Sequence, residues 1–440
     1  MRLIIKDIEI VNEGTRQKAS VLVDGDIIAE ISADCAGWQA DRTIDGTGKI
    51  LLPGAIDDQV HFREPGLTQK ADIASESAAA VAGGVTSFMD MPNTKPQTTT
   101  IEALNDKYAI AAQKSVANYS FYIGATNDNI DVIKSVDYKH VCGIKLFMGS
   151  STGNMLVDNE EALEKLFAAA PAIITAHCED EATIRANIEA FKQKYGNNVP
   201  WNCHGLIRSA EACYKSSAKA AALARRHGTR LHILHLSTAA ELDLLDRGAE
   251  RLVTGEACVH HLWFTDADYE TKKQYIKWNP AIKTQADRDA LRRAVADGTI
   301  PVVATDHAPH TIEEKQGSYF GVPSGAPMVQ HSLIAMLEMA DQGLWSYETV
   351  AERMCHAPAR LFDIKSRGFI RKGYKADIVI VEKRKWTVEK SNILYKCGWS
   401  PLEGCTFGNA VYMTLVNGQI AYENGNVNHS VRGERLEFER

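Results

Sequence analysis

The sequence has no excess of basic residues and no long apolar run. Its 440 residues carry 49 Lys and Arg against 56 Asp and Glu, so the formal net charge is −7 at pH 7. This balance argues against a nucleic-acid or anionic-membrane partner, because such partners select for a basic surface. The longest uncharged stretch, residues 318–337, is broken by Gly, Pro, Ser, Gln and His, so we expect no membrane span.

Paired cysteines are also missing. The nine cysteines are scattered and form no C-x-x-C pair, so we expect neither a disulfide framework nor a structural zinc cluster. The apolar run in the first residues, MRLIIKDIEIVNEG, is too short and too charged for a signal peptide. These features predict a cytoplasmic protein. Material for a core is plentiful, since 45% of the residues are hydrophobic and 24% are charged, as is typical of globular proteins.

Strand-rich ends enclose a segment in which apolar runs alternate with helix-like stretches. Asp24-Gly25 and Asn417-Gly418 predict hairpin turns near the two ends. We predict C-terminal strands at residues 368–373, 376–382, 411–417 and 419–423, and helices at 71–82, 216–227 and 287–297. The apolar runs of the middle segment suit parallel strands covered on both faces. They are residues 55–60, 86–91, 119–123, 143–148, 172–176, 231–234, 252–256 and 301–305.

These alternations predict an α/β fold. Eight strand–helix units over about 300 residues are typical of a (β/α)8 TIM barrel, and a doubly wound sheet is the alternative. We expect the barrel to span residues 53–364. Residues 1–52 and 365–440 are predicted to form a small β-sandwich domain from both chain ends.

Polar side chains fall at the ends of the predicted strands. In a TIM barrel these ends converge on one mouth, where active sites lie. A single histidine at a strand end is more often a hydrogen-bonded core residue. Several imidazoles, a lysine and a carboxylate at the expected ends favour a metal site instead. The residues are Gln59, His61, Lys145, His177, His235 and Asp306.

Two local motifs are more specific: HFREPG at residues 61–66 and TDHAPH at residues 305–310. MPNT at 91–94, GIKLF at 143–147 and KGYKADIVI at 372–380 accompany them. On these motifs the chain resembles the class I dihydroorotases of the amidohydrolase superfamily over essentially its whole length. The resemblance implies reversible, zinc-dependent interconversion of N-carbamoyl-L-aspartate and L-dihydroorotate, a step of de novo pyrimidine biosynthesis.

The resemblance also implies a zinc site. Bound Zn²⁺ lowers the pKa of water from 15.7 to about 7, which supplies the hydroxide that opens a cyclic amide. In the family pattern, Lys145 bridges two metals as a carbamate, and Asp306 shuttles a proton between the hydroxide and the amide nitrogen. The implied metal ligands are His61, Lys145, His177, His235 and Asp306.

The implied substrate is a small anion, and we expect no nucleic-acid or membrane partner. Arg63 offers a planar fork for a carboxylate, and Asn93 and His310 match the family's other carboxylate contacts. Asn279 matches a contact to the amide edge of the ring, with a plain turn as the alternative. The segment 149–154, GSSTGN, is interpreted equally as a lid or as an ordinary loop. The sequence leaves a homo-oligomer open.

The chain departs from the family at the first histidine of the strand-one signature H-x-H. Residue 59 is Gln, whose neutral amide oxygen is a poorer zinc donor than imidazole. The number of zinc ions, one or two, and the carboxylation of Lys145 are therefore left open. The alternatives are another cyclic amidase, such as a hydantoinase or allantoinase, and a catalytically inactive scaffold. Arg63 together with TDHAPH favours a carboxylated substrate. An active enzyme is favoured because the other site residues are all present: Arg63, Asn93, Lys145, Asp306 and His310.

Overall fold

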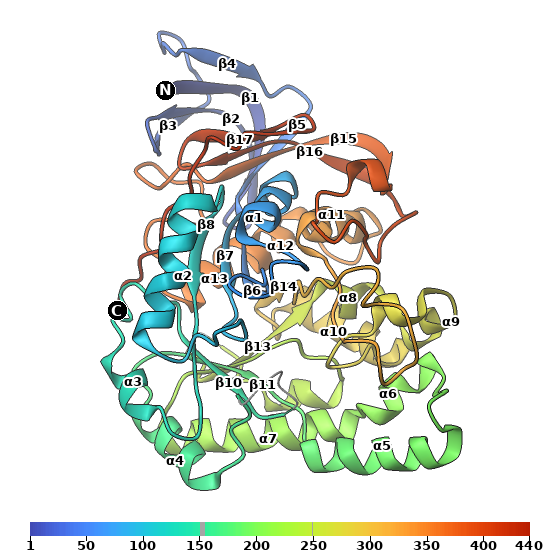
Figure 1. Cartoon of the computed structure of the whole chain (residues 1–440). Coiled ribbons are helices and arrows are strands. Elements are labelled where there is room, and N and C mark those ends of the chain that lie inside the picture. Colours follow the sequence, from blue (N-terminus) through green and yellow to red (C-terminus); the bar gives the residue numbers. More distant parts are fainter. Residues whose placement is uncertain (150–154, 249) are drawn as a thin grey trace.

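The two ends of the chain build one β-sheet, and the segment between them builds a barrel (Figure 1). The computed structural model describes residues 1–149, 155–248 and 250–440. Apart from Gly149, the predicted lid segment lies outside the described residues. Among the described residues, no helix is both long and apolar enough to cross a membrane.

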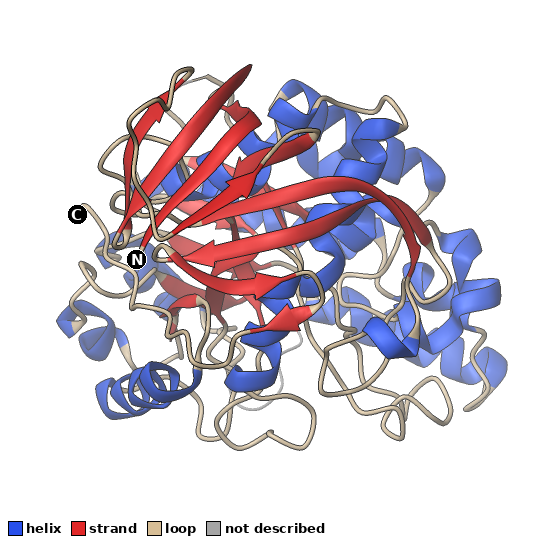
Figure 2. Cartoon of the chain, turned by 90° about the horizontal axis from the view of Figure 1, so that it is seen from above, coloured by secondary structure: helices blue, strands red, loops and turns tan. Residues whose placement is uncertain are grey.

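Strands from both chain ends hydrogen-bond into one continuous sheet, which has nine strands within the described residues (Figure 2). The strand at 49–53 joins the two halves, because it pairs in parallel with the first strand and antiparallel with the strand at 378–387. Side chains such as Ile5, Val21 and Ile380 share one apolar cluster. This confirms the predicted β-domain built from both ends. Its strands are β1 (Arg2–Asn12), β2 (Thr15–Asp24), β3 (Ile27–Ser32), β4 (Arg42–Asp45), β5 (Lys49–Pro53), β15 (Ile378–Thr387), β16 (Thr406–Val416), β17 (Gln419–Glu423) and β18 (Asn426–Val427).

The C-terminal hairpin prediction is confirmed, whereas one predicted strand is wrong. Asn417 and Gly418 have φ of 50° and 70°, the left-handed backbone that a two-residue hairpin needs. Residues 368–373 form no strand, because Gly368 and Gly373, with φ of 79° and 82°, turn the chain away from an extended path.

The eight apolar runs of the middle segment all contain strand, and their neighbours pair in parallel. The run 119–123 is divided at Tyr122 into two strands. The barrel closes where His61 N donates to His307 O at 2.7 Å. The TIM barrel is therefore confirmed over the doubly wound sheet. Its strands are β6 (Ala55–Val60), β7 (Val85–Asp90), β8 (Asn118–Phe121), β9 (Ile123–Gly124), β10 (Ile144–Phe147), β11 (Ile174–His177), β12 (Leu231–Ile233), β13 (Val253–Cys258) and β14 (Val302–Ala304).

Helices surround the barrel, and local signals set their ends (Figure 1). Ser209 accepts a hydrogen bond from Ala212 N at the start of α7, and Gly228 ends that helix in the left-handed conformation. The three predicted helices are present as α1, α7 and α10, although α7 begins earlier than expected. The helices are α1 (Ile73–Ala82), α2 (Ile101–Lys114), α3 (Ile130–Ser135), α4 (Glu160–Ala169), α5 (Glu181–Tyr195), α6 (His204–Ile207), α7 (Ala210–His227), α8 (Val259–Trp263), α9 (Tyr269–Lys272), α10 (Gln285–Asp297), α11 (Ser332–Asp341), α12 (Tyr347–Ala351) and α13 (Ala357–Leu361).

The last residues of the chain return to the barrel. Leu436 N donates to the carbonyl oxygen of Tyr119 on β8, and Lys365 N donates to Glu437 O. The proposed domain limits at residues 52 and 364 stay predictions.

Candidate active site

The carboxyl ends of the barrel strands surround a cavity of about 800 Å³. Every polar residue singled out from the sequence lines it, because parallel barrel strands bring their carboxyl ends to one mouth. The structure therefore brings these residues together, while their roles as ligands or substrate contacts stay predictions. They are Gln59, His61, Arg63, Asn93, Lys145, His177, His235, Asn279, Asp306 and His310.

Two imidazoles face each other at the ends of β11 and β12. His177 Nδ1 lies 2.9 Å from His235 Nε2, and His177 Nε2 lies 3.0 Å from Glu179 Oε2. Burial lowers the pKa of both imidazoles, so both are neutral at pH 7. His235 Nδ1 has no hydrogen-bond partner among the described residues. Two neutral imidazole nitrogens that converge, with a carboxylate behind one of them, are an arrangement typical of metal ligands.

Glu179 was missed by sequence reasoning. It follows β11 by two residues, and a buried ion pair joins it to Arg208. Burial alone would raise the pKa of Glu179, but the charge of Arg208 and the bond to His177 bring it to about 2. Glu179 is therefore an anion that fixes the ring of His177. Its position just past a strand end was the signal that could have identified it.

Lys145 lies on β10 with its amine inside the barrel. Its side chain is buried, and Nζ stands 4.4 Å from the centre of the Phe147 ring. Burial lowers the pKa of Lys145 to about 7. A large share of the amine is therefore neutral at pH 7, and only a neutral amine can form a carbamate.

Asp306 connects the first and last barrel strands. Its Oδ1 lies 3.1 Å from His61 Nε2 and accepts a hydrogen bond from Gln59 Nε2 at 3.3 Å. The amide oxygen of Gln59 accepts instead from Cys258 Sγ at 3.6 Å. Gln59 thus contacts Asp306 as a donor, which agrees with its poor suitability as a metal ligand. His61 Nδ1 lies 2.8 Å from Asn93 Oδ1.

Backbone strain accompanies these contacts. Arg63, His235 and Asp306 have φ of 66°, 41° and 44°, a region that residues other than glycine rarely occupy. Such strained positions persist only where the surrounding structure holds them, and they concentrate at functional sites.

Positive charge gathers at the other side of the cavity. Arg63 Nε donates to Pro309 O at 3.1 Å, and its NH2 group lies 3.2 Å from His310 Nε2. Lys70 Nζ lies 3.1 Å from His310 Nδ1 and 3.0 Å from Glu314 Oε1. Burial, with Arg63 and Lys70 nearby, lowers the pKa of His310 to about 3, so this ring is neutral. Sequence reasoning missed Lys70, although it lies in the loop that begins with REPG.

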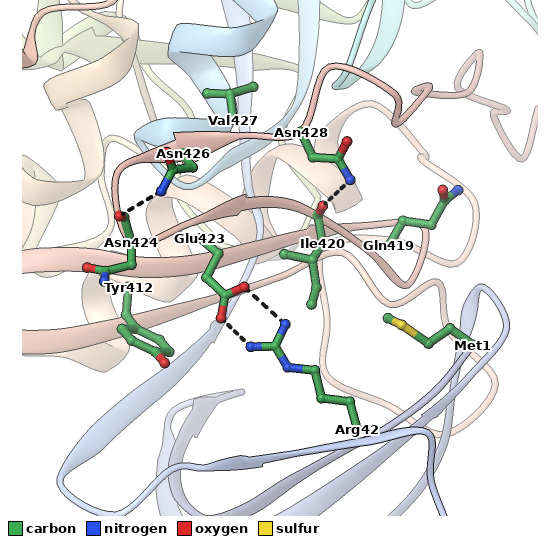
Figure 3. A pocket seen from close by; sticks show the side chains of 10 residues that line it. All are labelled: Met1, Arg42, Tyr412, Gln419, Ile420, Glu423, Asn424, Asn426, Val427 and Asn428. Atoms are coloured by element: carbon green, nitrogen blue, oxygen red, sulfur yellow. Dashed lines mark hydrogen bonds and ion pairs between the residues drawn. The ribbon is translucent and has the colours of Figure 1, made fainter.

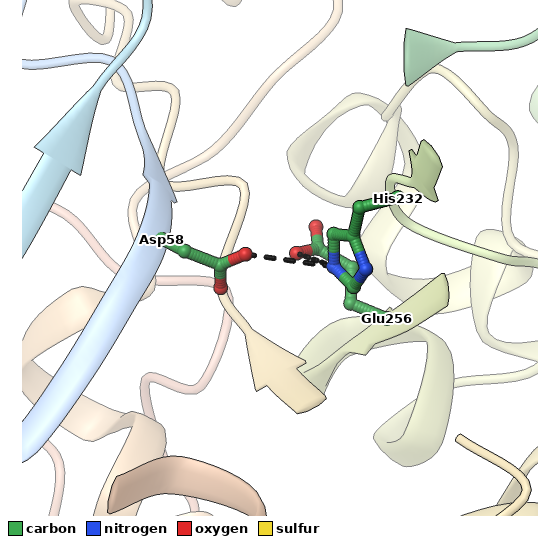
Figure 4. Close-up of side chains that lie close together, drawn as sticks. All are labelled: Asp58, His232 and Glu256. Carbon is green, nitrogen blue, oxygen red and sulfur yellow. Dashed lines mark hydrogen bonds and ion pairs between the residues drawn. The ribbon is translucent and has the colours of Figure 1, made fainter. Parts of the chain in front are cut away.

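Two further features lie outside this cavity. Asp58, His232 and Glu256 form a buried cluster within the barrel (Figure 4). A cavity of about 670 Å³ in the β-domain lies beside Arg42, whose guanidinium is already paired with Glu423 (Figure 3). It lacks the convergent titratable groups found at the barrel mouth.

The chain belongs to the amidohydrolase family, whose profile matches residues 50–421. It is similar to the dihydroorotase of Pyrococcus furiosus, with 33% identity over 88% of this chain and 85% of that protein. The dihydroorotase of Methanosarcina acetivorans is 32% identical over 98% of this chain and 95% of that protein. Among solved structures, an L-hydantoinase (dihydropyrimidinase) from Arthrobacter aurescens matches with a TM-score of 0.92 and 28% identity over 97% of both chains. The resemblance drawn from the motifs is confirmed.

Proposed function

We propose that the chain is a zinc-dependent dihydroorotase that interconverts N-carbamoyl-L-aspartate and L-dihydroorotate in pyrimidine biosynthesis. The observation that carries this proposal is the composition of one cavity. Imidazole, lysine and carboxylate donors line one side, and Arg63 and Lys70 line the other. A carboxylated cyclic amide needs both sides, because the donors hold the metal that activates water and the cations bind the carboxylate. The curated relatives named dihydroorotase support the same activity.

The donor side suits a transition metal ion, since neutral imidazole and carboxylate oxygen are ligands that Zn²⁺ accepts. When bound, zinc lowers the pKa of water and polarises an amide carbonyl. Lys145 would take part as a carbamate, which its lowered pKa favours. The residues that would hold the metal are His61, Lys145, His177, His235 and Asp306.

The chain's own proton chemistry rests on Asp306. Its carboxylate takes a proton from the attacking water and gives it to the leaving amide nitrogen, and ring closure reverses the transfer. Gln59 and His61 both contact Oδ1. These contacts hold the carboxylate through Oδ1 and leave Oδ2 as the oxygen that carries the proton.

The substrate side orients the anion. Arg63 binds the α-carboxylate through its planar guanidinium, and His310 and Asn93 complete the carboxylate contacts. Asn279 Oδ1, which has no hydrogen-bond partner among the described residues, accepts from the ring amide. A cytoplasmic location is a further part of this proposal, which leaves a homo-oligomer open.

A hydantoinase activity is the second candidate, because hydantoinases are among the closely matching solved structures. The test is to measure metal content and then turnover of dihydroorotate, carbamoyl-aspartate, hydantoin and allantoin. Turnover of the first two supports the proposal. Turnover restricted to hydantoin or allantoin selects the second candidate. No turnover by a metal-loaded protein favours an inactive scaffold.

Arg63→Gln is expected to lower kcat/KM for dihydroorotate by about 10- to 150-fold, mainly through KM, because a charge-assisted hydrogen bond is worth about 1.5–3 kcal/mol. Steady-state kinetics measure the change. Lys114→Gln is the matched control, since Lys114 pairs with Glu64 and does not line the cavity. An unchanged KM for Arg63→Gln would contradict the assigned carboxylate contact.

Gln59→His is expected to raise the number of zinc ions bound per chain, because imidazole is a better zinc donor than an amide. Elemental analysis after dialysis against a weak chelator measures this. An unchanged zinc content would show that the position of Gln59 does not limit metal binding.

A further inference from the structure

Three buried polar side chains that the proposed reaction does not use meet inside the barrel. Asp58 lies on β6, His232 on β12 and Glu256 on β13, and they point toward one another (Figure 4). All three are 0% exposed. In the strand order β13 and β14 separate β12 from β6, so Asp58 and His232 meet across the barrel interior.

The spacing of their atoms suits a cation. His232 Nε2 lies 3.2 Å from Glu256 Oε2 and 3.5 Å from Asp58 Oδ2. Ligand atoms that bind zinc at about 2.1 Å with tetrahedral angles lie about 3.4 Å apart. The ligand atoms of all three side chains lie within 4.8 Å of one another, so small side-chain movements bring one ion within reach of all of them.

No described group donates a hydrogen bond to the carboxylate of Asp58. Neither of its carboxylate oxygens has a hydrogen-bond partner among the described residues. The neighbouring Asp57 is also buried, but it accepts bonds from Thr305 N, Thr305 Oγ1 and Gln59 N. A buried carboxylate without a donor is costly, so Asp58 requires a proton or a cation.

The tautomer of His232 is compatible with a bound cation. Thr254 Oγ1 donates to Leu231 O at 3.2 Å and therefore accepts from His232 Nδ1, which lies 2.8 Å away. Nε2 of the neutral ring then presents a lone pair to both carboxylates. A cation between the three side chains accepts from all of them at once, whereas without a cation each carboxyl group needs its own proton.

We propose that Asp58, His232 and Glu256 bind a divalent cation such as Zn²⁺ inside the barrel, separate from any ion at the mouth. Two carboxylates balance the charge of this ion, and an imidazole completes the donor set. The ion links β6, β12 and β13. Its site also supports the mouth, because Glu256 Oε1 accepts a hydrogen bond from His235 N at 3.2 Å.

The decisive experiment is an anomalous difference map at the zinc absorption edge, from crystals of the full chain grown with zinc. We expect a peak between Asp58 Oδ2, His232 Nε2 and Glu256 Oε2. We expect this peak to persist in His177→Ala, which alters only the proposed metal site at the mouth. The variant therefore distinguishes the interior ion from any ion at the mouth. No peak at this position in the unmodified chain overturns the proposal and leaves the cluster sharing protons.

Zinc content gives a second measurement. Asp58→Asn is expected to lose one zinc ion per chain relative to the unmodified protein. Asp57→Asn, which changes an adjacent buried carboxylate with its own donors, is the matched control and keeps that ion. Equal zinc content in the unmodified chain and in Asp58→Asn contradicts the site, whatever the outcome of the activity assays.

Discussion

Replacing Asp306 by Asn is expected to lower kcat for dihydroorotate hydrolysis by about 10²- to 10⁴-fold, the usual contribution of a positioned acid–base group. Asn keeps the size of the side chain and can still contact Gln59 and His61. It cannot accept the proton that must reach the leaving nitrogen. Turnover in both directions, expressed per bound zinc ion, measures the effect.

The same variant separates two roles of Asp306. If Asp306 acts mainly as a proton carrier, Asp306→Asn keeps most of its zinc and still loses turnover in both directions. If it acts mainly as a ligand, zinc content and turnover fall together. Turnover close to that of the unmodified chain, with zinc fully bound, would exclude Asp306 from the proton transfer.

Lys145→Met is expected to abolish measurable turnover while making the metal-free protein more stable. Met has a similar volume and needs no solvation, whereas burial shifts the pKa of Lys145 from 10.5 to about 7. Each pKa unit corresponds to about 1.4 kcal/mol, so the gain in unfolding free energy is a few kcal/mol below pH 7. Denaturant unfolding of the zinc-free, bicarbonate-free protein measures it.

The pH dependence of that gain has a definite sign. Between about pH 7 and 10.5 the unfolded chain holds a proton on Lys145 that the folded chain has lost. Stability of the unmodified protein therefore rises with pH in this window, and the advantage of Lys145→Met shrinks. Lys107→Met is the contrasting control. Lys107 is also buried but pairs with Asp90 at 2.6 Å, so its loss destabilises the protein. An advantage of Lys145→Met that does not change with pH would contradict the lowered pKa.

The barrel could be predicted because parallel strands covered on both faces leave long apolar runs, and because their carboxyl ends share one mouth. The same rule predicts from the sequence that His177, His235 and Asp306 lie together. The rule does not extend to loops. Lys70 reaches the cavity only because the chain after β6 folds back beside His310. At residues 368–373, two glycines with positive φ outweigh an apolar pattern typical of a strand.

The buried cluster was not predicted for a related reason. All six residues of β6 are buried, so its sequence shows no alternation that assigns Asp57, Asp58 and Gln59 to different environments. Hydrogen-bond partners, which depend on distant strands, distinguish the satisfied Asp57 from the unsatisfied Asp58.

The sheet made from both chain ends also sets the order of events during synthesis. Pro53 on β5 pairs with Ile378 on β15. During synthesis this edge of β5 therefore has no partner strand until residues 54–377 have been made. At about 5–20 residues per second this takes on the order of 15–65 s. An uncovered strand edge can pair with another chain during that interval. Slower translation of the barrel segment should therefore increase aggregation of the nascent protein, and early chaperone binding to residues 1–53 should reduce it.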